Sequence, residues 1–172
     1  MKLFHLSEKS DITEFIPRPS KKQHWDGKSY VWAIAKGMVH NYYFPRDCPR
    51  ICLTGKEAIP HFKSLITKDI ETYRAVVFLP KHWKGKFIAT SLYRYEFDKQ
   101  QFSLIDEIAG YYVSETTQKP IDVVKLDHLP TLLSELNVLV RFESVEKLRE
   151  IRAKVIQTNE RFSIIRWSQL NQ

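Results

Sequence analysis

Residues 30–53 read YVWAIAKGMVHNYYFPRDCPRICL, a run that combines aromatic rings with two arginines and an aspartate. Within it, residues 42–44 have the composition of an aromatic strand, which leads into Pro45. Proline has no amide donor and fixes its own φ angle, so Pro45 and Pro49 predict a rigid loop or bulge in place of a regular central strand. The apolar alternation resumes at residues 51–53, and we expect this interrupted strand to share a sheet with a strand over residues 29–35.

The two arginines of this loop have two interpretations. Arg46 and Arg50 are four residues apart and could converge on a phosphate or a carboxylate, which a planar guanidinium binds through two hydrogen bonds. Alternatively, Arg46 pairs with Asp47 or a more distant carboxylate to anchor the loop, and Arg50 solvates an edge strand. The residue types alone leave both interpretations open.

Length and composition indicate one globular domain over residues 1–172. The chain has 43% hydrophobic and 27% charged residues, and its size suffices to bury a core without a metal or a disulfide. Its net charge of +7 favours anionic partners such as nucleic acid, nucleotides or acidic surfaces, but also suits a solvated surface. The lysines are scattered through residues 21–22, 81–86 and 147–154, and residues 80–86, PKHWKGK, are predicted to form a basic loop.

The cysteines and the N-terminal sequence exclude several classes. Cys48 and Cys52 are too far apart on an extended segment for a disulfide, and no further ligands stand at zinc spacing, so we expect buried thiols and no metal. No apolar run reaches the length of a signal segment or a membrane helix, which predicts a cytoplasmic protein without membrane contact. The oligomeric state has no signature in the sequence.

The remaining pattern predicts an α+β fold with a split, mostly antiparallel central sheet flanked by helices. Short apolar or alternating runs predict strands at residues 2–6, 29–35, 90–97, 101–105, 111–114, 120–126 and 138–142. Residues 73–79 form either a strand or a buried helix, and residues 162–167 form either a last strand or a strapped tail. Helical spacing predicts one turn after Ser10, a helix over residues 56–68, and helices from residue 129 and over residues 146–156.

Familiar cofactor-binding motifs are absent. There is no GKS/T phosphate loop, GxGxxG, GxSxG or HExxH, and five glycines exclude the common dinucleotide cradles. A site must therefore be built from side chains on strands and from aromatic loops. His5, at the centre of LFHLSE, either points into a cleft or is a satisfied core residue, and the polar Ser7 and Glu8 that follow favour the cleft.

Several phrases carry a resemblance to known families. LFHLSE, YVWA, NYYFPRDCPRI, LYRYEF and GYYVSE together resemble an uncharacterised bacterial family of unknown function over nearly the whole chain. More distantly, LFHLSEKSDITEF is similar to the first strand and helix of the ADP-ribosyltransferase superfamily. The phrase YYFPRDCPRI resembles the FYF-x-PR-S-P-M motif of DarT-like enzymes, which transfer ADP-ribose from NAD to DNA bases.

The resemblance implies a site for NAD as substrate. His5 would hold the nicotinamide ribose, and Arg46 would contact NAD and assist the transfer. Tyr30, Trp32 and Tyr43 would line the nicotinamide and adenine pockets, with Arg50 as a further contact. The two flat rings of NAD can stack on aromatic side chains, and its diphosphate can bind guanidinium groups.

The chain departs from the DarT-like pattern at the catalytic glutamate. Those enzymes have a glutamate at the start of a late strand, where this chain has Gly110 and Tyr111. Either Glu107 or Glu115 could serve as the carboxylate that glycosyl transfer requires, or neither does. Alternatively, Glu115 is a turn residue that pairs with Lys119.

Three functions follow from these observations. The first is an ADP-ribosyltransferase-like enzyme that acts on nucleic acid or protein. The second is a module of the same fold that binds a nucleotide or nucleic acid without catalysis. The third is a protein-interaction domain that uses exposed rings around Trp25 and Trp83.

Overall fold

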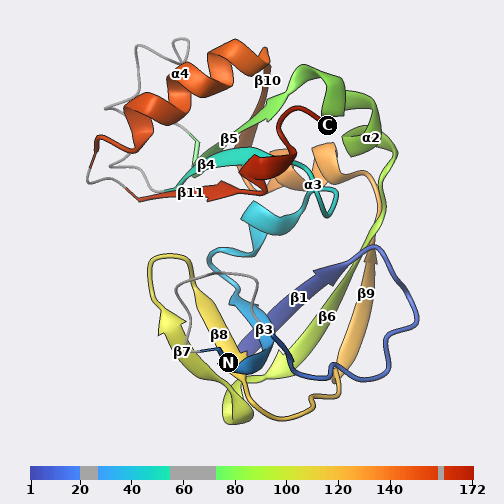
Figure 1. The fold of residues 1–172 in the computed structure, drawn as a ribbon. Helices are drawn as coiled ribbons and strands as arrows, with labels where there is room; N and C mark the ends of the chain where they lie inside the picture. The colour runs from blue at the N-terminus through green and yellow to red at the C-terminus, as the bar shows by residue number, and fades with distance from the viewer. Residues whose placement is uncertain (20–26, 55–72, 159–160) are drawn as a thin grey trace. The chain divides into compact units, whose positions relative to one another are not determined.

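The structure is a computed structural model that describes residues 1–19, 27–54, 73–158 and 161–172. The chain divides into two compact units (Figure 1). Unit 1 comprises Met1–Tyr42 and Ser91–Asp127, and unit 2 comprises Tyr43–Thr90 and His128–Gln172. Each unit is therefore assembled from two separate stretches of the chain.

Unit 1 is built on a sheet of seven antiparallel strands in the order β7-β8-β3-β1-β6-β9, with β2 paired to β3. Its strands are β1 (Lys2–Ser7), β2 (Arg18–Pro19), β3 (Ser29–Ala35), β6 (Leu92–Asp98), β7 (Ser103–Asp106), β8 (Tyr111–Ser114) and β9 (Asp122–Leu126). Successive residues of a strand point to opposite faces of a sheet, so each strand contributes to both faces. One face carries the apolar core of the unit, which includes Leu3, Val31, Ala33, Tyr95, Phe97 and Tyr112.

The opposite face of this sheet holds a buried carboxylate. Glu96 is 4% exposed, and its side chain accepts hydrogen bonds from Lys2 Nζ at 2.5 Å and from Arg94 Nη2 at 3.0 Å. The Arg94 guanidinium also lies 5.0 Å from the centroid of the Phe4 ring. Two cations thus compensate one buried negative charge, as burial of a carboxylate requires.

Unit 2 contains a four-stranded sheet in the order β10-β5-β4-β11, in which only β10 and β5 run parallel among the described strands. Its elements are β4 (Arg50–Thr54), β5 (Ala75–Pro80), the 3-10 turn η4 (Lys81–Trp83), α2 (Lys84–Ala89), α3 (Leu129–Glu135), β10 (Val138–Glu143), α4 (Val145–Val155) and β11 (Phe162–Ile165). Every residue of β5 is buried, which explains why its AVVFLP sequence lacks polar alternation.

Helix α4 covers the core of unit 2 with one apolar face. Ser144 caps its N-terminus by accepting a hydrogen bond from the Lys147 amide at 3.1 Å. Leu148, Ile151 and Val155 recur at helical spacing, are at most 1% exposed, and pack in one cluster with residues of β4 and β5. Burial of this face holds α4 on the unit.

The α+β class and the mostly antiparallel pairing are confirmed. Strands form at most of the predicted ranges, residues 42–44 being an exception. The segment over residues 73–79, for which the sequence left a strand or a helix open, contains the strand β5 (Ala75–Pro80). The predicted helix over residues 56–68 lies outside the described residues. The single-domain organisation stays a prediction, and the ADP-ribosyltransferase-like fold is taken up as a proposal below. None of the helices in the described part of the chain is long and apolar enough to span a membrane.

The expectation for residues 42–53 was wrong in two respects. Residues 42–44 form no strand, because Tyr42 ends the 3-10 turn η1 (Val39–Tyr42), and a turn follows in which the Cys48 amide donates to the Pro45 carbonyl at 3.0 Å. The two prolines do enclose a shaped turn, as predicted. The strands β3 and β4 belong to the seven-stranded and the four-stranded sheet respectively, so the expected shared sheet does not form.

The helical turn predicted after Ser10 is also absent. Phe15 instead forms an isolated antiparallel bridge, in which its amide and carbonyl exchange hydrogen bonds with Gln118 at 2.8 and 2.9 Å. The Phe15 ring packs edge-on against Tyr95 and Phe97 in the core of unit 1. Core burial and cross-strand pairing therefore override the local capping signal.

Residues 80–86 differ from the predicted basic loop as well. They form η4 and the start of α2, and Trp83 is buried, with 8% of its surface exposed. Trp83 therefore offers no exposed ring for a partner, against the third function considered above. Trp25 lies outside the described residues.

Candidate functional site

The predicted site residues are distributed over both units. His5, Tyr30, Trp32 and Glu115 belong to unit 1, whereas Tyr43, Arg46 and Arg50 belong to unit 2. Each group is described within its own unit.

His5 is fixed on strand β1 through its imidazole. Its Nδ1 lies 2.9 Å from the carbonyl oxygen of Trp32 on β3, and its ring centroid lies 4.8 Å from that of Phe15. A carbonyl oxygen only accepts hydrogen bonds, so Nδ1 carries the proton. In the neutral imidazole, Nε2 is then an acceptor that can receive a hydrogen bond from a hydroxyl group.

Three strands that contain phrases singled out in the sequence, β1, β3 and β8, are neighbours in the sheet of unit 1. In the sheet of unit 1, β3 pairs with β1 on one side and with β8 on the other. These strands carry LFHLS, SYVWAIA and YYVS. Segments that are up to about one hundred residues apart in sequence are thus neighbours in the sheet.

The strand register places His5 and the two aromatic candidates on opposite faces of the sheet. Leu3 is paired with Ala35, and Phe4 with Ile34. By alternation, His5 shares the face of Leu3 and Ala35, whereas Tyr30 and Trp32 share the face of Phe4 and Ile34. The imidazole contacts the backbone of Trp32 and not its ring.

An aromatic cluster occupies the face that carries Trp32. The Trp32 ring packs edge-on against Tyr111 at 5.7 Å and against Tyr30 at 6.3 Å, and the hydroxyl groups of Tyr42 and Tyr111 form a hydrogen bond. Tyr42 and Tyr111 were not among the candidates. Tyr111 could have been found from alternation in GYYVSE, since it is the residue that faces away from the buried Tyr112.

The candidate carboxylates stand at exposed positions. Glu115 follows β8 and forms an ion pair with Lys28 at 2.9 Å, in which both side chains are more than half exposed. The expected alternative, a pair with Lys119, is therefore replaced by a pair with Lys28. Glu107 is exposed in the turn between β7 and β8.

Gly110 occupies the position at which the resemblance calls for a glutamate, and its surroundings require glycine. Its φ angle is +67°, and a Cβ atom added there would lie 2.9 Å from Met38 Cγ and 3.3 Å from Ala35 Cβ. The left-handed backbone is also unfavourable for residues with a side chain. A glutamate cannot replace this glycine without displacing its neighbours.

Arg50 is enclosed in unit 2. It is 3% exposed, donates from Nη1 to the Cys48 carbonyl at 2.7 Å, and lies 5.2 Å from the Phe44 ring centroid. Burial raises the pKa of the Cys48 and Cys52 thiols to about 12, although the nearby Arg50 guanidinium lowers these pKa values in part. The cysteines are buried and free, as predicted.

The other two residues of unit 2 differ in exposure. Tyr43 is 4% exposed and therefore part of the core, whereas Arg46 is exposed in the turn that Pro45 and Cys48 enclose. Asp47, next to Arg46, lies 3.7 Å from the Arg166 guanidinium. Arg46 and Arg50 thus stand in different environments, one exposed and the other enclosed.

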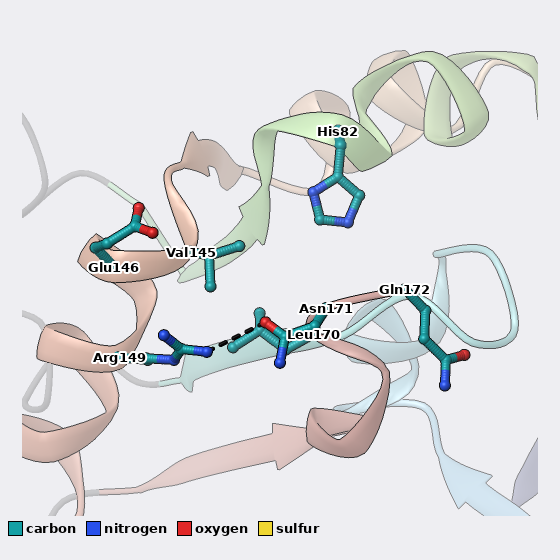
Figure 2. Close-up of a pocket in the computed structure, with 7 residues that line it drawn as sticks. All are labelled: His82, Val145, Glu146, Arg149, Leu170, Asn171 and Gln172. Carbon is teal, nitrogen blue, oxygen red and sulfur yellow. Dashed lines mark hydrogen bonds between the residues drawn. The ribbon is translucent and has the colours of Figure 1, made fainter.

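A cavity of about 440 Å³ lies elsewhere in unit 2, beside the first turn of α4. Figure 2 shows the His82 ring on one wall and Arg149 on another, where Arg149 donates to Asn171 Oδ1 at 3.2 Å. Arg149 also lies close enough to Glu146 to lower the pKa of that carboxyl, although the hydrogen bonds at the helix end lower it more. The cavity lining contains none of the predicted site residues.

No group of three or more histidine, cysteine, aspartate or glutamate side chains in the described ranges is arranged to hold a metal ion.

Comparison with known proteins identifies a family without a known activity. The model of a family of unknown function, DUF6886, matches residues 4–169. No curated protein and no solved structure matches the chain.

Proposed function

The chain belongs to DUF6886, a family of unknown function, and we propose that it is an ADP-ribosyltransferase-like protein that binds NAD and transfers its ADP-ribose. One observation carries the proposal. Strand β1, whose sequence resembles the opening strand of that superfamily, carries His5, and the His5 imidazole is anchored to the backbone of the adjacent strand β3.

The chemistry assigned to His5 follows from its tautomer. In the proposal, the hydrogen bond between Nδ1 and the Trp32 carbonyl orients the His5 ring, and the imidazole makes one hydrogen bond to a hydroxyl of the nicotinamide ribose. In the transfer, the bond between C1′ of this ribose and nicotinamide breaks, and the electron pair leaves with nicotinamide. The acceptor nucleophile then bonds to C1′ and loses its proton to water. His5 orients the sugar and takes no part in the bond changes.

The aromatic cluster lies on the other face of the sheet. The proposal therefore assigns the nicotinamide ribose to the half-buried His5, on the face that also carries the core of unit 1. Arg46, Arg50 and Tyr43 stay predictions from the resemblance, because they belong to unit 2. Mutation can distinguish which face of the sheet binds NAD, because His5 and Trp32 lie on neighbouring strands but on opposite faces.

The test is an NAD titration by calorimetry together with an assay of nicotinamide release. We expect His5→Phe, which keeps a ring beside Phe15, to weaken NAD binding about tenfold, the effect of one hydrogen bond of about 1.4 kcal/mol. Trp32→Phe, on the opposite face, is the matched control and should bind NAD like the wild type. Absence of both NAD binding and nicotinamide release in the wild-type protein would refute the proposal. A loss with Trp32→Phe alone would move the ligand to the aromatic face.

A second candidate function is favoured by the surroundings of Gly110 and Glu115. The position of the expected glutamate excludes a side chain, and Glu115 is held in an exposed ion pair. Gly110 is one of the two residues near the position of the expected glutamate, the other being Tyr111. The exclusion of a side chain at Gly110 and the ion pair of Glu115 support a module that binds a nucleotide without catalysis. NAD binding that is sensitive to His5→Phe, with no nicotinamide release under any condition, would select this function. Release that falls with Glu115→Gln or Glu107→Gln would select the enzyme.

A further inference from the structure

We infer that the cavity beside the first turn of α4 binds a free α-amino acid with an aliphatic side chain. Glu146 and Arg149, both on α4, are the charged groups that recognise its ammonium and its carboxylate. This site goes beyond the proposed function, because it lies in unit 2, is lined by none of the residues assigned to NAD, and requires no NAD.

The two charged residues of the cavity do not pair with each other. Glu146 and Arg149 stand three residues apart on α4, a spacing at which opposite charges are neighbours on a helix. Lys147 and Glu150 have the same spacing on the same helix and form an ion pair at 2.9 Å. Among the described residues, neither Glu146 nor Arg149 belongs to an ion pair. A ligand that carries both charges can therefore bridge them.

Both groups are charged and retain capacity for hydrogen bonds. Arg149 donates from Nη2 to Asn171 Oδ1 at 3.2 Å, and a guanidinium has five N–H donors, so others are left for a carboxylate. The pKa of Glu146 is lowered by a hydrogen bond from its own amide, then by Ser144 and by the charge of Arg149. Its carboxylate is thus ionised at neutral pH, and its remaining lone pairs can accept from an ammonium.

The pair of opposite charges selects the class of ligand. A simple anion would meet Glu146 as well as Arg149, and a simple cation would meet Arg149 as well as Glu146. An α-amino acid carries its ammonium and its carboxylate on one carbon atom, and Cβ atoms three residues apart on a helix are about 5–6 Å apart. Such a ligand can reach both side chains at once and brings no net charge.

His82 supplies a further donor from the other side of the cavity. Figure 2 shows its ring across the cavity from the Arg149–Asn171 pair. The imidazole contacts the Trp83 ring at 6.5 Å between centroids, and no hydrogen bond joins it to another residue in the described ranges. An imidazole has at least one N–H donor in either charge state, so His82 can donate to the carboxylate of the ligand.

Val145 and Leu170 form an apolar wall for the side chain of the ligand. Leu170 is 3% exposed in the core cluster beneath α4, and Val145 packs against that cluster. The volume of about 440 Å³ lies toward the small end of the range for ligand cavities, roughly 300–1,000 Å³. Charge pair, apolar wall and size together fit a small aliphatic amino acid.

The experiment uses L-leucine as the probe, with two analogues that each lack one of its charges. Isocaproate is leucine without the ammonium, and isoamylamine is leucine without the carboxylate. Ligand-observed NMR titrations of the full chain, without NAD, give the three Kd values. We expect leucine to bind at least about tenfold more tightly than either analogue, because each analogue leaves one charge of the cavity unpaired. Glycine, which cannot use the apolar wall, should also bind about tenfold more weakly than leucine.

Charge-neutralising variants assign the two ends of the ligand. Arg149→Gln should weaken leucine binding about tenfold without weakening isoamylamine, and Glu146→Gln should weaken leucine about tenfold without weakening isocaproate. The analogue that is still bound shows that each variant is folded, and glutamine also suits the first turn of a helix. Lys147→Gln and Glu150→Gln are the matched controls. They change the net charge by the same amounts on the same helix but lie outside the cavity lining, so they should bind leucine like the wild type.

Three results would overturn the inference. Equal affinities for leucine and one of its analogues would show that a single charge suffices for binding. Equal weakening by the cavity variants and by their controls would show an effect of net charge. Wild-type protein that binds no leucine at millimolar concentration has no such site. None of these results alters the NAD titration or the nicotinamide release, so the two proposals can fail separately.

Discussion

At the scale of single residues, the buried carboxylate of Glu96 links stability to pH. The hydrogen bond from Lys2 lowers the pKa of Glu96 below its usual value of 4.5, with further lowering by the charges of Lys2 and Arg94, while burial opposes them. A carboxyl whose folded pKa is depressed stabilises the protein above its unfolded pKa, and this stabilisation is lost as the pH falls through the folded pKa.

We therefore expect unfolding free energy to decrease below about pH 4.5 in the wild type and less steeply in Glu96→Gln. At pH 7, Glu96→Gln should cost about 2 kcal/mol, because two cations lose a charged acceptor in a buried site. Urea unfolding across a pH series measures both effects. Glu115→Gln is the control, since its ion pair is exposed and should contribute little. Parallel pH profiles for wild type and Glu96→Gln would contradict this role.

The same scale explains why the candidate site was only partly predictable. The sequence identified His5, Tyr30 and Trp32 as residues of interest, and two neighbouring strands do carry them. Which face each side chain occupies depends on the register between β1 and β3, and a shift of one residue exchanges the faces. A single sequence contains no direct measure of that register, so the separation of His5 from the two rings could not be foreseen.

At the scale of elements, the turn that leads into β8 depends on Gly110. Its positive φ angle and its close approach to Met38 leave no room for a Cβ atom. We expect Gly110→Ala to lower the unfolding free energy by about 1–2 kcal/mol, from backbone strain and displacement of Met38.

Gly85 provides the matched control for this prediction. It lies within helix α2, and no atom lies within 4 Å of an added Cβ. Gly85→Ala should therefore stabilise the protein by up to about 1 kcal/mol, through higher helix propensity. Thermal melts of both variants test whether Gly110→Ala lowers the melting temperature and Gly85→Ala raises it. Equal changes in melting temperature would show that the contact with Met38 does not determine the effect of Gly110→Ala.

Element by element, prediction succeeded where side-chain periodicity and burial agree. Residues 29–35 and 111–114 alternate or run apolar, and both are strands with the predicted bounds. The prediction of a helical turn failed at residues 10–16, because Phe15 is buried in the core of unit 1 in spite of the capping signal at Ser10. The prediction of a strand failed at residues 42–44, which are aromatic but form no strand. The failures have one cause, which is that long-range packing is not encoded in local composition.

At the scale of the whole molecule, the two thiols report on the opening of unit 2. Cys48 and Cys52 are buried with pKa values of about 12, so at pH 8 only about one thiol in 10⁴ is ionised. We expect iodoacetamide to label the native protein very slowly, and both cysteines to become labelled as urea unfolds unit 2. Mass spectrometry counts the modified thiols at each urea concentration, and fully denatured protein is the control. Rapid labelling of native protein at pH 8 would show that unit 2 opens locally.

The assignment of the chain to two units, each made of two separated stretches, has a consequence for biosynthesis. While the ribosome has delivered only the first ninety residues, β1 and β3 lack β6 and β8, and β5 lacks β10. The nascent protein must therefore hold several unpaired strand edges and apolar faces until later segments emerge, a state that favours association with chaperones or with other nascent chains. Translation speed between residues 90 and 127 should accordingly influence how much of the product escapes aggregation.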